Sequence, residues 1–220
     1  IVQKYDALTQ SLFLDMFGDP VKNEKGWETD KVVNVCSKIF GGGTPSKAKP
    51  EYFIGNIPWV TPKDMKSEYI FDSIDHVNLK AIENSSAKLI PSGNLLMVIR
   101  SGILKHTLPL AINKVDVTVN QDMKAFIPNA GKTNTIFLKY FFQCSSSYLL
   151  GKVRAVTADN IEFNQIKELS FPLVPINLQN QFAERVQAID VQKQQAQLEL
   201  AKSEELFQSL LQRAFNGELN

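Results

Sequence analysis

The sequence of 220 residues lacks the features that several classes of protein require. Its apolar runs are short and are interrupted by Lys, Asn or Pro, so no segment is long enough to span a membrane. It opens without a charged-then-apolar leader, and its two cysteines and two histidines form no CxxC or clustered pattern. We therefore expect a cytoplasmic protein with no membrane partner and no metal site. Cys36 and Cys144 should be reduced thiols rather than a disulfide.

The signatures of common enzyme classes are also missing. Neither the GxxxxGK[ST] loop nor GxGxxG occurs, and GxSxG and HExxH are absent. His76 and His106 have no recognisable nucleophile–base partner in the sequence. We expect this chain to contain no catalytic residues and to be no enzyme.

Charge is unevenly distributed along the chain. The net charge is +1, and 44% of the residues are hydrophobic, which is ordinary for a globular protein. Residues 31–170 carry 17 Lys and Arg against 11 Asp and Glu, a balance of +6, whereas the two ends together carry −5. A basic middle points mildly to a polyanionic partner, and chance is the alternative explanation.

The middle of the chain mixes strand and helix patterns. "NLLMVIRS" (94–101) reads as a buried strand, and "VDVTVNQ" (115–121) alternates with its valines on one face. "MKAFIP" (123–128) follows closely enough to pair with that second strand. "IFLKYFFQCSSSYLL" (136–150) reads as an aromatic-rich helix, and "NQIKEL" (164–169) as a helical turn followed by a strand at "SFPLV". Without a regular βαβ rhythm, these patterns predict a mixed α/β (α+β) globular domain.

The chain ends predict two helices. Tyr5, Leu8, Leu12 and Met16 recur at helical spacing, and Gly18 is a stop signal. The last segment, 178–215, contains no Pro or Gly, and its stripe of mostly apolar positions follows a 4-3 rhythm. At 1.5 Å per residue this helix measures roughly 57 Å, longer than the domain needs, so we expect a coiled coil. Packing of the whole stripe on its own domain is the alternative. The predicted helix-pairing residues are Leu8, Leu12, Phe182, Val186, Ile189, Leu200, Phe207 and Leu210, and Asn177 is the predicted N-cap.

One phrase occurs near both ends. "LTQSLFLDMFGDP" (8–20) aligns without a gap with "LFQSLLQRAFNGEL" (206–219), matching at Leu, Gln, Ser, Leu and Phe. The separation is far larger than a solenoid period. We interpret the two phrases as equivalent helix ends in a larger repeat, of which this chain holds the tail of one unit and the whole of the next.

Four polar stretches are candidates for nucleic-acid contact. "FGGGTPSKAKPEYF" (40–53) combines glycines that permit close backbone approach with hydroxyls and lysines that suit phosphates, and a flexible surface loop is the alternative. After the buried strand, "VIRSGILKHT" (98–107) supplies an arginine suited to guanine, and "VTVNQD" supplies amides suited to adenine. A plain salt bridge and structural amides are the alternatives there. "LGKVRAVTADN" (150–160) is a candidate phosphate clamp. The predicted DNA-binding residues are Gly42, Gly43, Thr44, Ser46, Lys47, Lys49, Lys63, Arg100, Ser101, Lys105, His106, Asn120, Gln121, Lys152 and Arg154.

A family resemblance covers nearly the whole chain. "FGDP" followed by "GWE", then "GGTPSK", "NIPWVTPKDM", "NSSAKLIPSGNLLMVIR", "VTVNQD" and "FPLVPINLQNQFAERV" run in the order found in the DNA-specificity subunits of type I restriction-modification systems. The chain resembles that family. The resemblance implies that residues 21–175 are one target-recognition domain and 176–220 a spacer and dimerisation helix. Residues 1–20 would be the end of a preceding spacer helix.

The resemblance also implies a function. Such a subunit reads one half of a bipartite site in double-stranded DNA and docks methyltransferase subunits, and through them the restriction subunit. S-adenosylmethionine, ATP and Mg belong to those partners, so no cofactor is expected in this chain. The chain would be the C-terminal half of a two-domain subunit, or a natural half-subunit that self-associates through its long helix. A coiled-coil scaffold without DNA binding and a small nucleotide-using enzyme are the alternatives.

Overall fold

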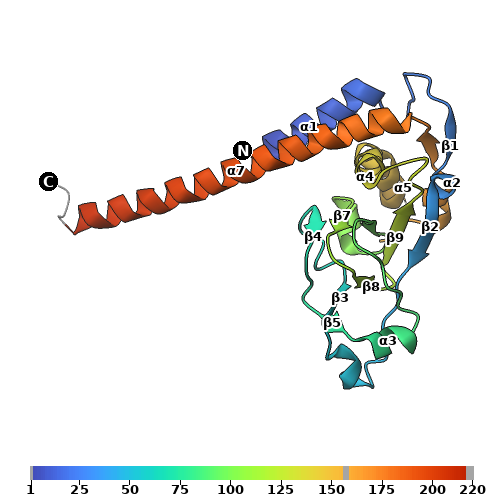
Figure 1. The fold of residues 1–220 in the computed structure, drawn as a ribbon, viewed down its shortest axis with the longest axis horizontal. Helices are drawn as coiled ribbons and strands as arrows, with labels where there is room; N and C mark the ends of the chain where they lie inside the picture. Colours follow the sequence, from blue (N-terminus) through green and yellow to red (C-terminus); the bar gives the residue numbers. More distant parts are fainter. Residues whose placement is uncertain (1, 156–158, 217–220) are drawn as a thin grey trace. The chain divides into compact units, whose positions relative to one another are not determined.

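The protein divides into two compact units. The computed structural model describes residues 2–155 and 159–216, except for the side chains at positions 2, 3 and 152–155 (Figure 1). Residues 1–16 and 180–220 form one unit, called here the helical unit, and residues 17–179 form the other, the globular unit. The mixed α/β class, the short first helix and the long last helix predicted from the sequence are confirmed.

A five-stranded sheet forms the centre of the globular unit. In spatial order its strands are β2 (Cys36–Gly41), β9 (Met123–Pro128), β6 (Leu95–Val98), β7 (Leu110–Asn113) and β4 (Tyr69–Ile70). Neighbours are antiparallel except β4, which runs parallel to β7. All four residues of β6 are buried. An uninterrupted apolar run suits a strand covered on both faces, so the buried strand predicted at 94–101 is confirmed.

Two smaller sheets complete the strand structure. β5 (His76–Val77), β3 (Ile57–Val60) and β8 (Thr118–Val119) form one, and β1 (Thr29–Lys31) with β10 (Ser170–Pro172) forms the other. Tyr52, Trp59, Val77 and Ala81 make a separate hydrophobic cluster beside the three-stranded sheet. The globular unit therefore carries a satellite core in addition to the one under its main sheet.

The predicted pairing of 115–121 with 123–128 is wrong. β9 pairs with β2 and β6, whereas β8 pairs in parallel with β3. The chain turns at Asn120, so the two segments join different sheets. The predicted alternation fails as well, because Thr118 is buried between Val117 and Val119 and Val115 is exposed. Residues 117–119 are buried on both faces of the strand, so the valine spacing does not distinguish a buried face from an exposed one.

Short helices surround the sheets. In chain order they are α2 (Val32–Val35), the 3-10 turn η1 (Pro50–Phe53), α3 (Leu79–Glu83), the 3-10 turn η2 (Gly102–Lys105), α4 (Thr135–Cys144), α5 (Ser146–Ala155) and α6 (Phe163–Lys167). The Asn134 side chain caps α4 by accepting a hydrogen bond from the Phe137 N–H at 2.8 Å. The predicted helix at 136–150 is present as two helices that break at Ser145. The predicted loop at 150–160 is wrong over 150–155, because α5 continues through these residues.

Aromatic rings from α4 fill the main core. Phe142 lies 5.1 Å from Phe126 of β9, and Phe141 lies 4.7 Å from Phe171 of β10, measured between ring centroids. All four side chains are fully buried. Edge-to-face and tilted ring pairs contribute about 0.5–1.5 kcal/mol each beyond the burial of their area. The predicted helix and strands are thus fixed to one another by contacts between segments distant in sequence.

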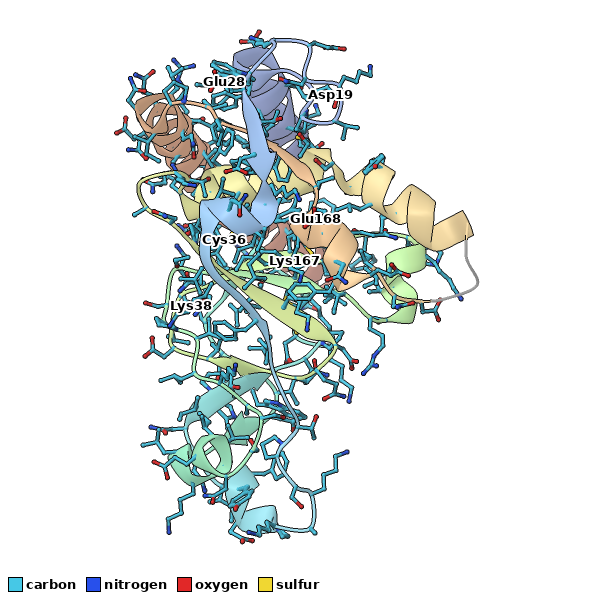
Figure 2. The ribbon with its side chains drawn as sticks, turned by 90° about the vertical axis from the view of Figure 1, so that its right-hand side faces the viewer. Asp19, Glu28, Cys36, Lys38, Lys167 and Glu168 are labelled. Atoms are coloured by element: carbon cyan, nitrogen blue, oxygen red, sulfur yellow. The ribbon has the colours of Figure 1, made fainter. Side chains whose placement is uncertain are left out.

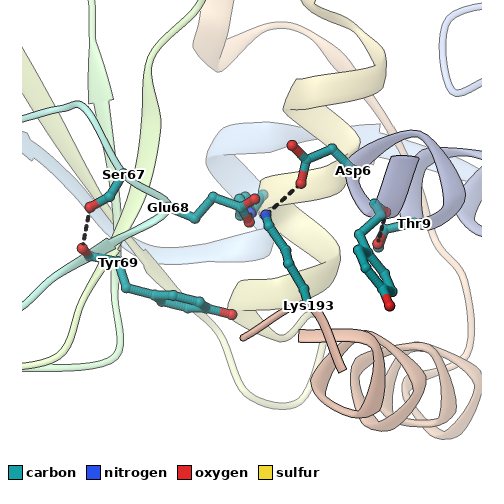
Figure 3. Close-up of polar contacts among 8 residues, drawn as sticks. Asp6, Thr9, Ser67, Glu68, Tyr69 and Lys193 are labelled. Atoms are coloured by element: carbon teal, nitrogen blue, oxygen red, sulfur yellow. Dashed lines mark hydrogen bonds and ion pairs between the residues drawn. The ribbon is translucent and has the colours of Figure 1, made fainter. Parts of the chain in front are cut away.

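Two antiparallel helices make the helical unit. α1 (Val2–Phe17) lies along the first part of α7 (Ile176–Phe215), as Figure 1 shows. The Phe13 and Phe182 rings meet edge to face at 5.5 Å, and the Lys193 ammonium contacts the Asp6 carboxylate at 2.6 Å (Figure 3). α1 ends at Phe17, and the next residue, Gly18, has a φ of +79°, the left-handed conformation expected of a helix stop.

Two details of the predicted helices are corrected. α7 begins at Ile176, so Asn177 lies within the first turn rather than at the N-cap. The side of α1 that is buried carries Thr9, Phe13 and Phe17, while Leu8 is 51% exposed. Position 8 is about 140° around the helix from position 13, which is the residue that meets α7.

The second half of α7 is uncovered. Its apolar stripe is buried or half-buried from Phe182 to Ala196, the stretch that lies beside α1. From 197 to 216 every residue is exposed, including Leu206, Phe207 and Phe215. A row of exposed large apolar side chains on a helix favours packing against a further helix.

Candidate nucleic-acid interface

The topology of the main sheet brings three predicted loops to one end. Gly41, the last residue of β2, faces Lys124 near the start of β9, and Val98, the last residue of β6, faces Met123. The glycine loop after β2, the Arg100 loop after β6 and the turn before β9 therefore emerge side by side. We call the polar residues gathered there the sheet-end cluster: Thr44, Arg100, Asn120, Gln121, Asp122 and Lys124.

Asp122 connects the members of this cluster. Its carboxylate accepts a hydrogen bond from the Arg100 Nε at 2.5 Å and another from the Asn120 Nδ2 at 3.0 Å. Its main-chain N–H donates to the Asn120 Oδ1 at 3.1 Å, and its carbonyl oxygen accepts from the N–H groups of Ile99 and Arg100 at 2.8 and 3.1 Å. The arginine loop is thus tied to the turn through both backbone and side chains.

Arg100 is ion-paired but remains accessible. Its side chain is 58% exposed, against 23% for that of Asp122. An exposed ion pair of this kind contributes at most about 1 kcal/mol to folding. The salt bridge that was the alternative interpretation of Arg100 is present, and the guanidinium is still accessible to solvent. Asn120 is buried and hydrogen-bonded to Asp122, which fits the structural alternative, whereas Gln121 is exposed. A DNA contact at either position stays a prediction.

The glycine loop packs tightly on its own protein. A Cβ at Gly42 would lie 1.6 Å from the Val119 carbonyl oxygen, and one at Gly43 would lie 2.0 Å from the Ser86 hydroxyl oxygen. The Gly43 N–H donates to the Val119 carbonyl at 3.0 Å. The close backbone approach that these glycines permit is to neighbouring loops of this chain, and a DNA contact at Gly42 and Gly43 stays a prediction. Thr44, next in sequence, is exposed and donates its hydroxyl to the Gln121 Oε1 at 2.5 Å.

Lys124 adds a second cation beside Arg100. Its ammonium lies 4.7 Å from the centroid of the Phe163 ring and close to the Gly41 backbone. Partial burial, and secondly the positive charge of Arg100, lower the pKa of Lys124 from its usual 10.5. Two neighbouring cations, one of them paired with the Asp122 carboxylate, leave this end of the sheet suited to an anionic or hydrogen-bond-accepting partner.

The helical turn after Arg100 holds three more predicted residues. Ser101 caps η2 by accepting from the Ile103 N–H at 3.4 Å, and its own N–H donates to the Asp159 carbonyl at 2.9 Å. Lys105 forms an ion pair with the Asp159 carboxylate at 3.0 Å. His106 is exposed at the end of the turn. These residues border the sheet-end cluster, to which the main-chain bridge between Arg100 and Asn160 connects them.

Other predicted contacts are not brought into the cluster. Lys49 donates to the Tyr52 hydroxyl at 3.0 Å in the satellite core, which raises the pKa of Lys49. Ser46, Lys47 and Lys63 are exposed without a contact to the cluster among the residues the structure describes. The side chains of Lys152 and Arg154 lie outside the described residues. For all of these positions a DNA contact stays a prediction.

The predicted helix-pairing residues divide into two groups. Phe182 and Val186 are buried, and Leu12 and Ile189 are half-buried, within the helical unit. Leu8, Leu200, Phe207 and Leu210 are exposed.

Sequence reasoning missed Asp122 and Lys124 as members of the site. Asp122 directly follows the two amides that were singled out, and Lys124 lies at the start of a strand whose position was predicted but whose partners were not. The sequence does show that Asp122 is an acidic residue in a polar turn and so a candidate partner for an arginine. It does not show that the partner is Arg100, because the two residues are 22 positions apart. Only the strand order shows that these residues are neighbours.

The described residues hold no group of three or more His, Cys, Asp and Glu side chains placed for a metal ion. No helix in the described ranges is both long and apolar enough to cross a bilayer. Cys36 and Cys144 are free thiols, and burial raises the pKa of each to about 12, with Asp19 adding to the shift at Cys144. Figure 2 places Cys36 and Lys38 along β2, with Glu168 at the end of α6.

Comparison with known proteins gives consistent matches. Residues 24–202 match the family model described as the type I restriction modification DNA specificity domain. The chain is 34% identical over 206 residues to the specificity subunit of the type I restriction enzyme EcoR124I/EcoR124II of Escherichia coli, covering 86% of this chain and 50% of that protein. It is 33% identical over 156 residues to the MjaIX specificity subunit of Methanocaldococcus jannaschii, covering 69% of this chain and 35% of the relative. The chain thus spans half or less of each relative.

Solved structures share the fold. The HsdS subunit from Thermoanaerobacter tengcongensis superposes with a TM-score of 0.62 at 18% identity, covering 99% of this chain and 52% of that one. A chain from a study of complex assembly and conformational transition of the type I R-M system gives 0.66 at 21% identity, covering 99% and 53%. At these identities the likeness establishes the fold alone.

Proposed function

The chain belongs to the type I restriction-modification DNA specificity family, and from that premise we propose that it reads one half of a bipartite target in double-stranded DNA. The observation that carries the proposal is the sheet-end cluster, where Arg100 and Lys124 lie beside the exposed Gln121 amide. Basic side chains set the register on phosphates, and polar side chains at the same place read base edges.

The proposed role is recognition without catalysis. Methyltransferase subunits, and the restriction subunit through them, would bring S-adenosylmethionine, ATP and Mg together with base flipping and methyl transfer. The relatives are named specificity subunits, which supports this division of labour. For this chain, residues 21–175 would be the target-recognition domain.

The long helix is proposed as the spacer between reading heads. α1 and α7 already pack as antiparallel helices, and the exposed half of α7 offers apolar positions for a further helix, by self-association or from another spacer segment. Changing α7 by whole turns would then change the gap between the two half-sites. An unchanged gap in the recognised site would refute the spacer role.

DNA binding is tested on the chain assembled with its methyltransferase subunits. Fluorescence anisotropy with labelled duplex should show affinity that falls steeply with salt, with a slope in log–log form of about −0.9 for each phosphate contacted. Methylation mapping in cells with and without the subunit should reveal a bipartite motif that depends on it. Weak binding that is insensitive to salt, with no dependent motif, would reject the proposal.

A scaffold role is the second candidate. It is favoured by the exposed apolar residues of α7, including Phe207 and Phe215. A scaffold would form stable complexes through this helix and retain no DNA. Size-exclusion chromatography with and without duplex separates the two roles, because only the reading role predicts co-elution with DNA.

A further inference from the structure

The way Asp122 holds Arg100 suggests a specific role for the pair. We propose that Asp122 is a positioning residue that orients Arg100 to read a guanine in the major groove. This inference rests on the proposed function and deepens it by naming the base class and the two residues responsible. The carboxylate accepts from the Arg100 Nε, while the carbonyl of the same aspartate accepts from the Arg100 main-chain N–H. The main chain and the side chain of Arg100 are therefore both hydrogen-bonded to Asp122.

The hydrogen bond at Nε leaves the reading end of the guanidinium available. Among the described residues, no acceptor is bonded to the two terminal amino groups of Arg100. Those two groups form the fork that matches guanine, which presents O6 and N7 as paired acceptors in the major groove. Exposure fits this orientation, because the guanidinium side chain is 58% exposed and the carboxylate behind it is 23% exposed.

Asn120 holds the carboxylate itself in place. It donates to the second carboxylate oxygen at 3.0 Å and accepts from the Asp122 N–H at 3.1 Å, and it is 7% exposed. The chain of contacts therefore runs from a buried amide through a half-buried carboxylate to an exposed guanidinium. An arginine held in this way loses less side-chain entropy on binding than a free one.

The groups around Arg100 favour an accepting partner. The Gln121 Oε1 accepts a hydrogen bond from the Thr44 hydroxyl, so this acceptor already has a partner within the chain. Lys124 contributes a further donor. Donors therefore predominate at the outward surface of the cluster, and guanine is the base that offers two acceptors side by side in the major groove.

The test uses the chain assembled with its methyltransferase subunits and a pool of duplexes randomised at every position. Selection identifies the half-site of the unaltered protein. Arg100→Lys keeps the positive charge but removes the two paired amino groups of the guanidinium. Asp122→Ala removes the carboxylate that orients Arg100. Both should reduce preference for one and the same G·C pair by about 5- to 150-fold. Binding to unselected DNA should be unchanged in Arg100→Lys and equal or stronger in Asp122→Ala, since that variant loses a negative charge.

Two further variants control for charge and folding. Glu168→Gln breaks a comparable exposed ion pair, with Lys31 at 2.5 Å, away from the cluster and should leave base preference intact. Asp122→Asn retains an oxygen that can accept from the Arg100 Nε and should lose less preference than Asp122→Ala. Thermal melts of every variant should match that of the unaltered chain, and preference is compared only among the variants that do.

Each remaining outcome overturns the inference. A selected half-site without guanine, or preference that survives in both Arg100→Lys and Asp122→Ala, would show that Arg100 does not read a guanine. Equal weakening on all sequences would make Arg100 a phosphate contact. Failure of the unaltered assembly to select any duplex would instead refute the proposed function, so the two failures are distinguishable.

Discussion

Strand β9 joins two regions of opposite character. Phe126 lies in the aromatic core with α4, whereas Lys124, two residues earlier, lies in the sheet-end cluster. Phe126 and its partner Phe142 are fully buried. The cluster makes its hydrogen bonds internally, yet Arg100 remains open to solvent. The aromatic contacts therefore stabilise the fold, whereas the polar contacts at the sheet end hold an accessible side chain in place, which is the arrangement that the proposed DNA reading requires.

The largest expected effect is in the core. Phe141→Ala removes a fully buried ring that packs on Phe171 and Phe142, and should lower the free energy of unfolding by about 3–5 kcal/mol. Urea denaturation followed by tryptophan fluorescence measures this. Phe141→Leu is the matched control, since it retains most of the volume. A loss below 1 kcal/mol would mean that the core is not where stability is concentrated.

Substitutions in the glycine loop should destabilise the fold, as core substitutions do, although the loop adjoins the sheet-end cluster. Gly42→Ala places a Cβ against the Val119 carbonyl, so the backbone must shift, at a cost of about 1–3 kcal/mol. Gly131→Ala, with its nearest neighbouring atom at 3.5 Å and no positive φ, should be neutral or slightly stabilising. Thermal melts of the two variants provide the comparison. If both were equally stable, the loop would be available for a ligand after all.

Replacing Lys124 should stabilise the fold slightly and weaken DNA binding. Its folded-state pKa lies below 10.5, so the unfolded chain binds more protons between the two values and stability rises with pH across that window. Lys124→Met should therefore raise the free energy of unfolding at neutral pH by less than about 1 kcal/mol, because the group is only partly buried and solvent screens its charge. The gain should shrink as pH approaches 10.5. DNA affinity should fall, measured by anisotropy, and a variant that gained affinity would contradict its place in the interface.

The smallest effect on stability is expected on the uncovered half of α7. Phe207→Glu alters a side chain that is 59% exposed, so the free energy of unfolding of the chain should change by no more than about 0.5 kcal/mol. Self-association, measured by analytical ultracentrifugation, should weaken. Phe182→Glu, on the covered half, should instead destabilise the helical unit. Equal effects at both positions would remove the distinction between the two halves.

Local patterns predicted the elements well. The proline-free 4-3 stripe indicated α7, the apolar run "LLMV" indicated β6, and Gly18 marked the end of α1. The same reasoning did not predict that Leu8 is exposed or that β9 pairs with β2 and β6. Leu8 and the adjacent Thr9 both lie at helical spacing from later apolar residues, so the spacing alone does not decide which of them is buried. The neighbour of a strand depends on distant segments and cannot be predicted from the local sequence.

The sequence by itself determined the family, the mixed α/β class and the long helix, because periodicity and motif order are written along the chain. Only the tertiary structure decided that Asp122 holds Arg100, that Gly42 packs on Val119 and that half of α7 is uncovered. These facts depend on contacts between segments far apart in sequence. Strand pairing, which is fixed by the packing of the whole sheet, is what brings such segments together.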